Sequence, residues 1–492
     1  TWRAAPVTGP VTVTCEVYAW DLSVRGAHLD TTHGFFNGAS VFLRVLGAED
    51  RRCEVEILPP TGARYRRWEV ATSLRRRRAP AWGFGLYAAA DYDELIDHPV
   101  EMGTFTRASF TARGVPHDVA ITGRHRADMG RLARDMKKVC EQHIDFWNDG
   151  AHRPGGRRGL RGRRTRAPMD RYVFLVTALG EGYGGLEHRA STALMCARND
   201  LPHAGMKEAT EGYRSFLGLV SHEYFHTWNV KRIKPAAFTP YDLDRENYTR
   251  LLWAFEGITS YYDDLALLRA GLITREQYLE TLGRGITQLL RTPGRKKQTV
   301  ADSSFDAWTK YYRQDENSPN AIVSYYGKGS LAALCLDLAI RSGSAGRKSL
   351  DDVMRALWKK HGLTGAGVEE DGVERVAEAV TKLKLGRRFA AWLRSTAELP
   401  LKDLLATHGI DMDLRPAESG SDKGGRKAGR DAAALRARAV LGVRGAVNAN
   451  AAAGEYKLTH VLDGGAAQAA GLAAGDVIVA VDGLRVGSGG VD

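Results

Sequence analysis

Two histidines and a glutamate stand close together in the segment 221–226, which reads Ser-His-Glu-Tyr-Phe-His. The surrounding residues follow a helical pattern, and on a helix positions i and i+4 project from the same face. His222 and His226 can therefore offer two imidazole nitrogens to one metal ion. Glu223 lies one step further round the helix, where its carboxylate can reach a water on that metal. Two histidines, a carboxylate base and an open position are the arrangement of metal-dependent hydrolysis.

A site of this kind needs a third protein ligand, and the sequence restricts where it can lie. The longer pattern HExxHxxGxxH is excluded, because Asn229 and Arg232 occupy its glycine and last histidine positions. The other common solution is a glutamate on a following helix. Glu246 lies in a polar stretch after two prolines, where a residue of a first helical turn is expected. Glu256 lies in the apolar helical segment 251–268, where an unpaired carboxylate is costly to bury, so we predict Glu256 as the ligand.

The residues around this site resemble a known family. The segment 253–257, Trp-Ala-Phe-Glu-Gly, is similar to the W-x-x-E-G element that holds the third zinc ligand of aminopeptidase N-like enzymes. Together, the segments 222–235 and 256–264 and a PDZ-like C-terminal region resemble the glycyl aminopeptidase family of zinc metallopeptidases more closely. The resemblance covers nearly the whole chain, and its motifs are specific when they occur together.

The resemblance implies a catalytic zinc site. It implies one zinc ion with three protein ligands, which are His222, His226 and Glu256. It also implies that Glu223 is the general base for the attacking water. One of the aspartates at 263–264 is expected to orient a ligand histidine through its second ring nitrogen.

A second element of the resemblance concerns substrate binding. The segment 184–188, Gly-Gly-Leu-Glu-His, is similar to the G-x-M-E-N element of aminopeptidases, whose glutamate binds the free α-amine of the substrate. The resemblance therefore assigns Glu187, with Gly184 and Gly185, to substrate binding through a charge-assisted hydrogen bond. His188 stands in place of the asparagine. From the residues alone, a glutamate after two glycines is more simply interpreted as a turn residue.

A third element concerns the oxyanion. The segment 325–329, Tyr-Tyr-Gly-Lys-Gly, resembles the Y-x-K-G element whose tyrosine stabilises the charge that develops on the carbonyl oxygen. Aligned on Lys328 and Gly329, the matching catalytic residue is Tyr326. Its neighbour Tyr325 is the alternative, since only one of two adjacent side chains can face the cleft.

The sequence pattern predicts a multidomain α+β protein, because 492 residues are too many for one ordinary core. Residues 1–124 are predicted to form an all-β domain, because alternating segments such as 11–18 and 41–45 are separated by glycine and proline turns. Residues 125–412 change to a helical period, and the resemblance makes them a thermolysin-like zinc peptidase domain with an α-helical half. The elements expected there are a strand at 172–178 and helices at 129–147, 274–290, 329–342, 350–361 and 373–383.

The C-terminal part is expected to be a linker and a small β domain. Residues 413–437 are polar and rich in glycine, which is typical of a linker. Residues 438–492 resemble part of a PDZ domain. Because the sequence stops before the helix and last strand of the PDZ peptide groove, we expect this partial domain not to bind peptides tightly.

The charge of the chain comes largely from two arginine runs. The formal net charge is +12, and the runs lie at 75–78 and 153–166. The second run is rich in glycine and lacks apolar periodicity, so it predicts a surface loop. RNA binding through this loop is the alternative to an incidental insertion, which we favour. No nucleic-acid partner is therefore expected.

Other features bear on the compartment. No apolar run reaches the length of a membrane span. The five scattered cysteines, without CxxC spacing, indicate neither a disulfide framework nor a cysteine metal site, which is compatible with the cytoplasm. The first residue is threonine rather than methionine, so we expect the N-terminus to be incomplete, and its lack of a leader carries little weight.

The leading hypothesis is a zinc aminopeptidase that hydrolyses the N-terminal peptide bond of peptides and proteins. The resemblance favours small N-terminal residues, glycine or alanine, and Glu223-assisted attack of zinc-activated water. The alternative is a PDZ-assisted zinc endopeptidase that acts on unfolded or tagged chains and would cleave blocked peptides. A non-catalytic scaffold is disfavoured, because every residue needed for the chemistry is still present.

Overall fold

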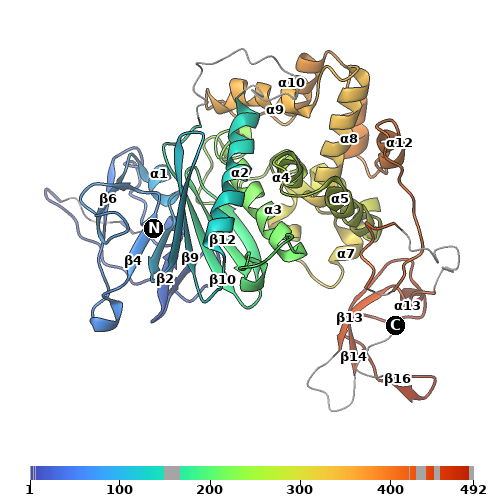
Figure 1. The fold of residues 1–492 in the computed structure, drawn as a ribbon, viewed down its shortest axis with the longest axis horizontal. Helices are drawn as coiled ribbons and strands as arrows, with labels where there is room; N and C mark the ends of the chain where they lie inside the picture. Colours follow the sequence, from blue (N-terminus) through green and yellow to red (C-terminus); the bar gives the residue numbers. More distant parts are fainter. Residues whose placement is uncertain are drawn as a thin grey trace. The chain divides into compact units, whose positions relative to one another are not determined.

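The computed structural model describes residues 2–3, 5, 7–148, 167–419, 421–427, 439–447 and 455–486 (Figure 1). The chain divides into two compact units. The first unit comprises Thr1–Arg134 and Met169–Phe216, and the second comprises Asp135–Pro168 and Leu217–Asp492. The predicted arginine-rich loop at 153–166 lies outside the described residues.

The first unit is rich in β-structure, as predicted, and contains three sheets. The strands of a four-stranded antiparallel sheet are, in order, β1 (Ala27–Leu29), β2 (His33–Phe36), β7 (Val100–Gly103) and β4 (Glu69–Thr72). The strands of a five-stranded mixed sheet are, in order, β11 (Tyr183–Glu187), β12 (Ser191–Ala197), β10 (Tyr172–Leu179), β9 (Val115–Thr122) and β8 (Thr106–Ala112). A smaller sheet has the order β3 (Cys53–Ile57), β6 (Gly85–Ala89) and β5 (Arg75–Arg76), and helix α1 spans Tyr92–Ile96.

The core of this unit lies between the four-stranded and the five-stranded sheets. Phe35 and Ala71 of the first sheet pack with Ala120, Val173 and Leu175 of the second. Strand β10 is almost entirely buried, which explains why its sequence is a continuous apolar run rather than an alternating one. Side chains from two facing sheets thus build one apolar layer.

Two predicted strands of this unit are absent from the structure. Residues 11–18 are irregular chain, and the predicted strand at 41–45 is a turn residue followed by irregular chain. The side chains of Val11, Val13 and Val17 are exposed, so their alternating pattern buries no apolar face. An alternating sequence becomes a strand only where it packs on a partner, and here no described strand offers one.

Helices dominate the second unit, and they agree with the predicted pattern. Helix α2 spans Met129–Trp147, as its amphipathic period predicted, and α5 spans Arg275–Leu290. The further helices are α3 (Glu211–Phe225), α4 (Ile258–Arg269), α6 (Val300–Phe305), α7 (Ser318–Ala321), α8 (Gly327–Gly343), α9 (Leu350–Leu357), α10 (Gly372–Thr381), α11 (Gly386–Leu393) and α12 (Leu401–Ala406). The predicted helix at 350–361 continues from α9 as a π-helical turn at Trp358–Gly362.

Helix α8 is the central helix of this unit. Residues 331–340 of α8 are all buried, and α4, α5, α9, α11 and α12 contact it (Figure 1). A helix that is apolar on all sides is expected in such a position. A π-helical turn at Trp253–Gly257 precedes α4 and also packs on α8. The second unit therefore holds residue 256 and the start of α8 in direct proximity.

The C-terminal part of the second unit contains short β-elements. Strands β13 (Val443–Val447), β14 (Tyr456–Val461) and β15 (Val477–Ile478) form one sheet, and β16 (Ala480–Val481) pairs with β17 (Leu484–Arg485). A short helix, α13, spans Ala466–Ala469. Among the described residues, no helix has both the length and the apolar character needed to cross a membrane.

Candidate active site

The three predicted metal ligands converge in the second unit. The Nε2 atoms of His222 and His226 each lie 3.2 Å from Oε2 of Glu256. Donor atoms bound to one tetrahedral zinc at about 2.0–2.1 Å lie about 3.3 Å from one another. Each histidine nitrogen thus already stands at the separation from the carboxylate oxygen that a zinc ion requires, and all three donor atoms lie within 4.8 Å of one another, so these residues fit the metal.

Both histidines are oriented by hydrogen bonds that Nδ1, the ring nitrogen facing away from Glu256, donates to an oxygen. Nδ1 of His222 lies 3.2 Å from Oδ2 of Asp263. Nδ1 of His226 lies 2.7 Å from the backbone oxygen of Asn229. These contacts place the proton on Nδ1 and turn Nε2 toward Glu256, as is usual for metal-binding histidines. Of the two aspartates considered from the sequence, Asp263 makes this contact.

Asn229 connects the two segments that carry the ligands. Its side-chain nitrogen donates to the backbone oxygen of Ala254 at 3.0 Å and to Oγ1 of Thr259 at 3.1 Å. Because its backbone oxygen also holds His226, one residue links the end of α3 to the π-helical turn that contains Glu256. In the sequence, Asn229 only excludes a longer zinc motif, and no local pattern predicts these contacts.

The charges of the ligand cluster favour a bound cation. Burial raises the pKa of the Glu256 carboxyl, but the adjacent His226 and His222 outweigh this effect and lower it overall. Burial lowers the pKa of His222, but hydrogen bonds to Asp263 and Glu256 outweigh it and raise the pKa well above its usual value. The cluster thus contains three carboxylates near the two imidazoles, which are those of Glu256, Asp263 and the buried Glu223. A divalent ion would balance this negative charge.

A buried histidine supports the helix that carries the first ligands. Nε2 of His143 lies 2.8 Å from Oγ of Ser221, and that hydroxyl donates to the backbone oxygen of Asp263 at 2.9 Å. Burial lowers the pKa of His143 to about 3, so its ring is neutral. This series of hydrogen bonds, which connects α2 to α3 and α3 to α4, was not predicted, because it joins residues that are distant in sequence.

The structure distinguishes the two adjacent tyrosines. Tyr325 is 1% exposed, and its ring packs against Tyr311. Tyr326 precedes α8, and its ring centroid lies 6.2 Å from that of His222. It also lines a cavity of about 400 Å³, and its hydroxyl lies 3.2 Å from that of Tyr312. Burial raises the pKa of Tyr326 well above its usual value, so its hydroxyl keeps its proton and can donate a hydrogen bond.

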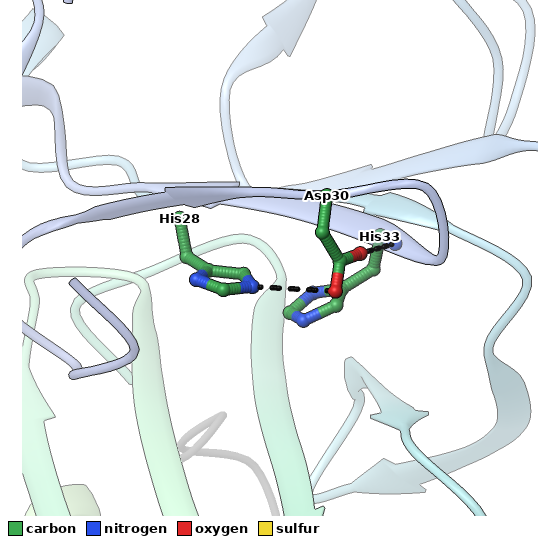
Figure 2. A group of neighbouring side chains, drawn as sticks. All are labelled: His28, Asp30 and His33. Carbon is green, nitrogen blue, oxygen red and sulfur yellow. Dashed lines mark hydrogen bonds and ion pairs between the residues drawn. The ribbon is translucent and has the colours of Figure 1, made fainter. Parts of the chain in front are cut away.

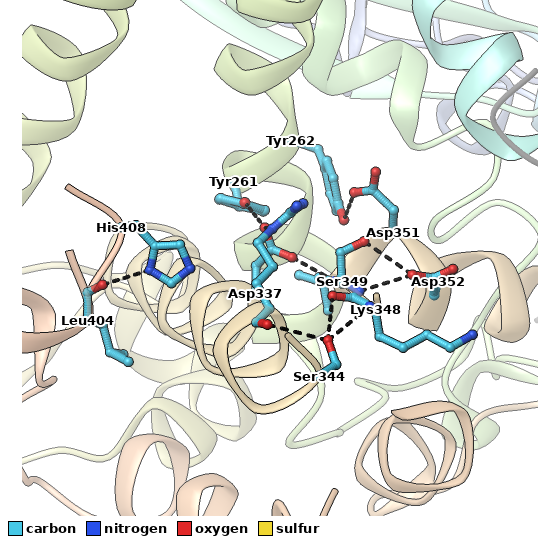
Figure 3. Close-up of polar contacts among 12 residues, drawn as sticks. Tyr261, Tyr262, Asp337, Ser344, Lys348, Ser349, Asp351, Asp352, Leu404 and His408 are labelled. Atoms are coloured by element: carbon cyan, nitrogen blue, oxygen red, sulfur yellow. Dashed lines mark hydrogen bonds and ion pairs between the residues drawn. The ribbon is translucent and has the colours of Figure 1, made fainter. Parts of the chain in front are cut away.

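Helix α4 is fixed by two tyrosine–aspartate hydrogen bonds on its other side (Figure 3). The hydroxyl of Tyr261 donates to Oδ2 of Asp337 at 2.7 Å, and that of Tyr262 donates to Oδ1 of Asp351 at 2.8 Å. Asp337, on α8, also accepts from the backbone nitrogen of Leu350 at 2.7 Å. These bonds join α4 to α8 and α9, and so determine where Asp263 stands.

The predicted amine-binding segment lies in the first unit. Residues 183–187 form the edge strand β11, in which Glu187 pairs with Thr192 of β12. The interpretation of Glu187 as a turn residue is therefore wrong. Nδ1 of the next residue, His188, lies 3.0 Å from Oδ1 of the buried Asp97, which holds the end of the strand.

Comparison with known proteins places the chain in a family. Residues 215–332 match the model of the M61 glycyl aminopeptidase, residues 1–104 that of the peptidase M61 N-terminal domain, and residues 434–489 that of the PDZ domain. A solved structure of an aminopeptidase N family protein from Idiomarina loihiensis is 38% identical and covers 95% of this chain and 75% of that chain, with a TM-score of 0.87.

Two further comparisons do not contribute to the assignment of the family. A mutant M1 zinc metallopeptidase from Deinococcus radiodurans, solved with a Tyr-Ser-Ala substrate, is 13% identical, covers 76% of this chain and 72% of that chain, and has a TM-score of 0.44. No curated protein sequence matched the chain. The family models and the 38% identical structure agree on the class of protein. The chain belongs to the M61 glycyl aminopeptidase family and is a zinc metallopeptidase.

Proposed function

We propose that this peptidase is an aminopeptidase that removes small residues, glycine or alanine, from the free N-terminus of peptides and proteins. The observation that carries the proposal is the convergence of His222 and His226 on Glu256, with 3.2 Å between each Nε2 and Oε2. These three side chains would hold one zinc ion. When bound, zinc supplies a Lewis acid and lowers the pKa of water to about 7.

Glu223 is the general base in this proposal. It follows the ligand His222 on α3, and it is buried. Its carboxylate takes a proton from the attacking water and returns that proton to the nitrogen of the departing amine.

Tyr326 stabilises the oxygen of the scissile carbonyl. As that carbon becomes tetrahedral, its oxygen gains negative charge, and a protonated phenol nearby donates a hydrogen bond to it. The raised pKa of Tyr326 and the 6.2 Å between its ring centroid and that of His222 support this role. Tyr325 is almost completely buried, so its hydroxyl is the less accessible of the two to a substrate oxygen.

Glu187 selects substrates with a free N-terminus. Its carboxylate at the end of β11 forms a charge-assisted hydrogen bond with the α-ammonium group, which an acetylated substrate lacks. The bond from His188 to Asp97 supports the role, because it fixes the backbone directly after Glu187. The match of residues 434–489 to a PDZ domain favours the second candidate, an endopeptidase to which that domain recruits chains.

A pair of substrates separates these functions. Glycyl and alanyl anilides are compared with their N-acetylated forms, each with and without a zinc chelator. We expect chelator-sensitive hydrolysis of the free-amine anilides alone. Hydrolysis of both forms, or only of longer blocked peptides, would favour the endopeptidase.

A further inference from the structure

A second group of metal-binding side chains lies in the first unit, on the β1–β2 hairpin. His28 and Asp30 are two residues apart along an extended chain, so they point to the same face. His33 stands opposite Asp30, whose backbone nitrogen donates to the backbone oxygen of His33 at 3.0 Å. Opposed residues of an antiparallel pair share a face. All three side chains therefore project to one side of the hairpin (Figure 2).

The donor atoms of the three side chains are close enough to bind one ion. Nε2 of His28 lies 3.6 Å from Oδ2 of Asp30, and one donor atom of each residue lies within 4.8 Å of the others. In a tetrahedral zinc site the donors lie about 3.3 Å apart. Small rotations of the side chains would bring them to that separation.

His33 is oriented as metal-binding histidines are. Its Nδ1 lies 3.1 Å from Oε1 of Glu101, a carboxylate on β7 that is 2% exposed. The same oxygen accepts a hydrogen bond from Oγ1 of Thr122 at 2.9 Å. A carboxylate that accepts a hydrogen bond from Nδ1–H keeps the proton on Nδ1, so the lone pair of Nε2 is available to a metal. Asp263 holds His222 in the same way in the catalytic cluster.

Asp30 is also held in place for binding. Its Oδ1 accepts from the backbone nitrogen and the hydroxyl of Thr32 at 2.6 and 2.7 Å, and from the backbone nitrogen of His33 at 3.0 Å. These three bonds fix the carboxylate with Oδ2 toward His28. Asp30 is 33% exposed, whereas both histidines are buried, so an ion could enter past Asp30.

The charge balance of the group also suits a divalent ion. The carboxyl group of Asp30 lies 3.6 Å from His28, and that of Glu101 lies 3.1 Å from His33. Acidic groups this close to the histidines would favour a cation at the group. Two imidazoles and one carboxylate are ligands that suit zinc and similar first-row transition ions, whereas magnesium and calcium prefer oxygen alone.

We propose that His28, Asp30 and His33 form a second metal site, which binds a divalent first-row transition ion such as Zn²⁺ and fastens the β1–β2 hairpin. This inference is independent of the proposed function, because none of its residues takes part in that mechanism. Water would complete the coordination, as in other sites with three protein ligands.

The test is the metal content of the full chain after equilibration with Zn²⁺ and desalting. The wild type should retain two zinc ions per chain. The double variant H28Q/H33Q and the single variant H222A should each retain one, and the triple variant none. The control H203A, which replaces an exposed histidine outside both clusters, should retain two. One zinc ion in both the wild type and H28Q/H33Q would overturn the proposal, as would two in both.

A second measurement tests the site if the double variant H28Q/H33Q does not fold well enough for its metal content to be compared. In the H222A background, which lacks a catalytic ligand, added Zn²⁺ should raise the melting temperature, because an ion that binds only the folded state stabilises it. The single change H28Q in that background should abolish the rise. An equal rise in H222A and H222A/H28Q would contradict the second site.

Discussion

Gly257 and Gly329 meet backbone to backbone. A Cβ at position 257 would lie 2.7 Å from the Cα of Gly329 and 2.8 Å from the backbone oxygen of Tyr325. Gly257 directly follows Glu256, and Gly329 follows Tyr326 by three residues. The close approach of the two glycines therefore sets the distance between Glu256, the proposed zinc ligand, and the start of α8, next to the proposed oxyanion donor.

We predict that Gly257→Ala disturbs both zinc binding and turnover. The added methyl group must separate the π-helical turn from α8, and overpacking of this kind costs about 1–3 kcal/mol. Zinc affinity and kcat should both fall, whereas Gly180→Ala should change neither, since a Cβ there meets nothing within 4 Å. Isothermal titration with zinc and steady-state kinetics check this. Wild-type behaviour of Gly257→Ala would show that the contact is unimportant.

Tyr326→Phe should lower kcat and leave KM nearly unchanged. It removes a hydrogen bond that forms fully only as charge develops, and the loss of one such donor costs about a hundredfold in kcat. Tyr325→Phe is the matched control, because Tyr325 is buried next to it. Kinetics of both variants on an alanyl anilide decide the matter. A larger loss of kcat in Tyr325→Phe than in Tyr326→Phe would assign Tyr325 as the oxyanion donor instead.

Glu187→Gln should weaken the use of free-amine substrates. Loss of a charge-assisted hydrogen bond worth about 1.5–3 kcal/mol corresponds to roughly a tenfold or greater fall in kcat/KM. The nearby exposed Glu181→Gln serves as the control. The ratio of kcat/KM for an alanyl anilide to that for its acetylated form is the quantity to measure. An unchanged ratio in Glu187→Gln would remove this residue from amine recognition.

Asp337→Ala should destabilise the second unit. It leaves the hydroxyl of Tyr261 and the backbone nitrogen of Leu350 without their buried acceptor, at a cost of about 3 kcal/mol. Urea unfolding should show a lower midpoint. Asp413→Ala, which changes a side chain that is 86% exposed, should unfold like the wild type. Equal stability of the two variants would argue against the role of Asp337.

Local sequence patterns were sufficient to predict a helix or strand where that element buries one face against the rest of the protein. Residues 129–147 form a helix over exactly the span that their amphipathic period predicted, because that period reports the buried stripe directly. Residues 11–18 show the limit of the same argument. Their residues do alternate, but the side chains of Val11, Val13 and Val17 stay exposed and no described strand pairs with the segment, so it is not a strand.

Spacing and resemblance were enough to propose the three ligands and an orienting aspartate at 263–264, whereas the contacts that hold these segments together could not be predicted. Asn229 reaches Ala254 and Thr259, and Asp337 reaches Tyr261, across dozens of residues. Such pairs depend on how helices pack, and a single sequence does not encode them in any local pattern. The pair formed by Gly257 and Gly329 is similar, since each glycine is explained only by the other.

The central claim is that His222, His226 and Glu256 hold the catalytic zinc while Glu223 moves the proton. Its most direct test is the Glu223→Gln variant, in which zinc content and turnover of an alanyl anilide are measured on the same sample. We predict unchanged zinc content and a fall in kcat of at least about a hundredfold. Near-normal turnover, or a loss of zinc equal to that of H222A, would contradict the account.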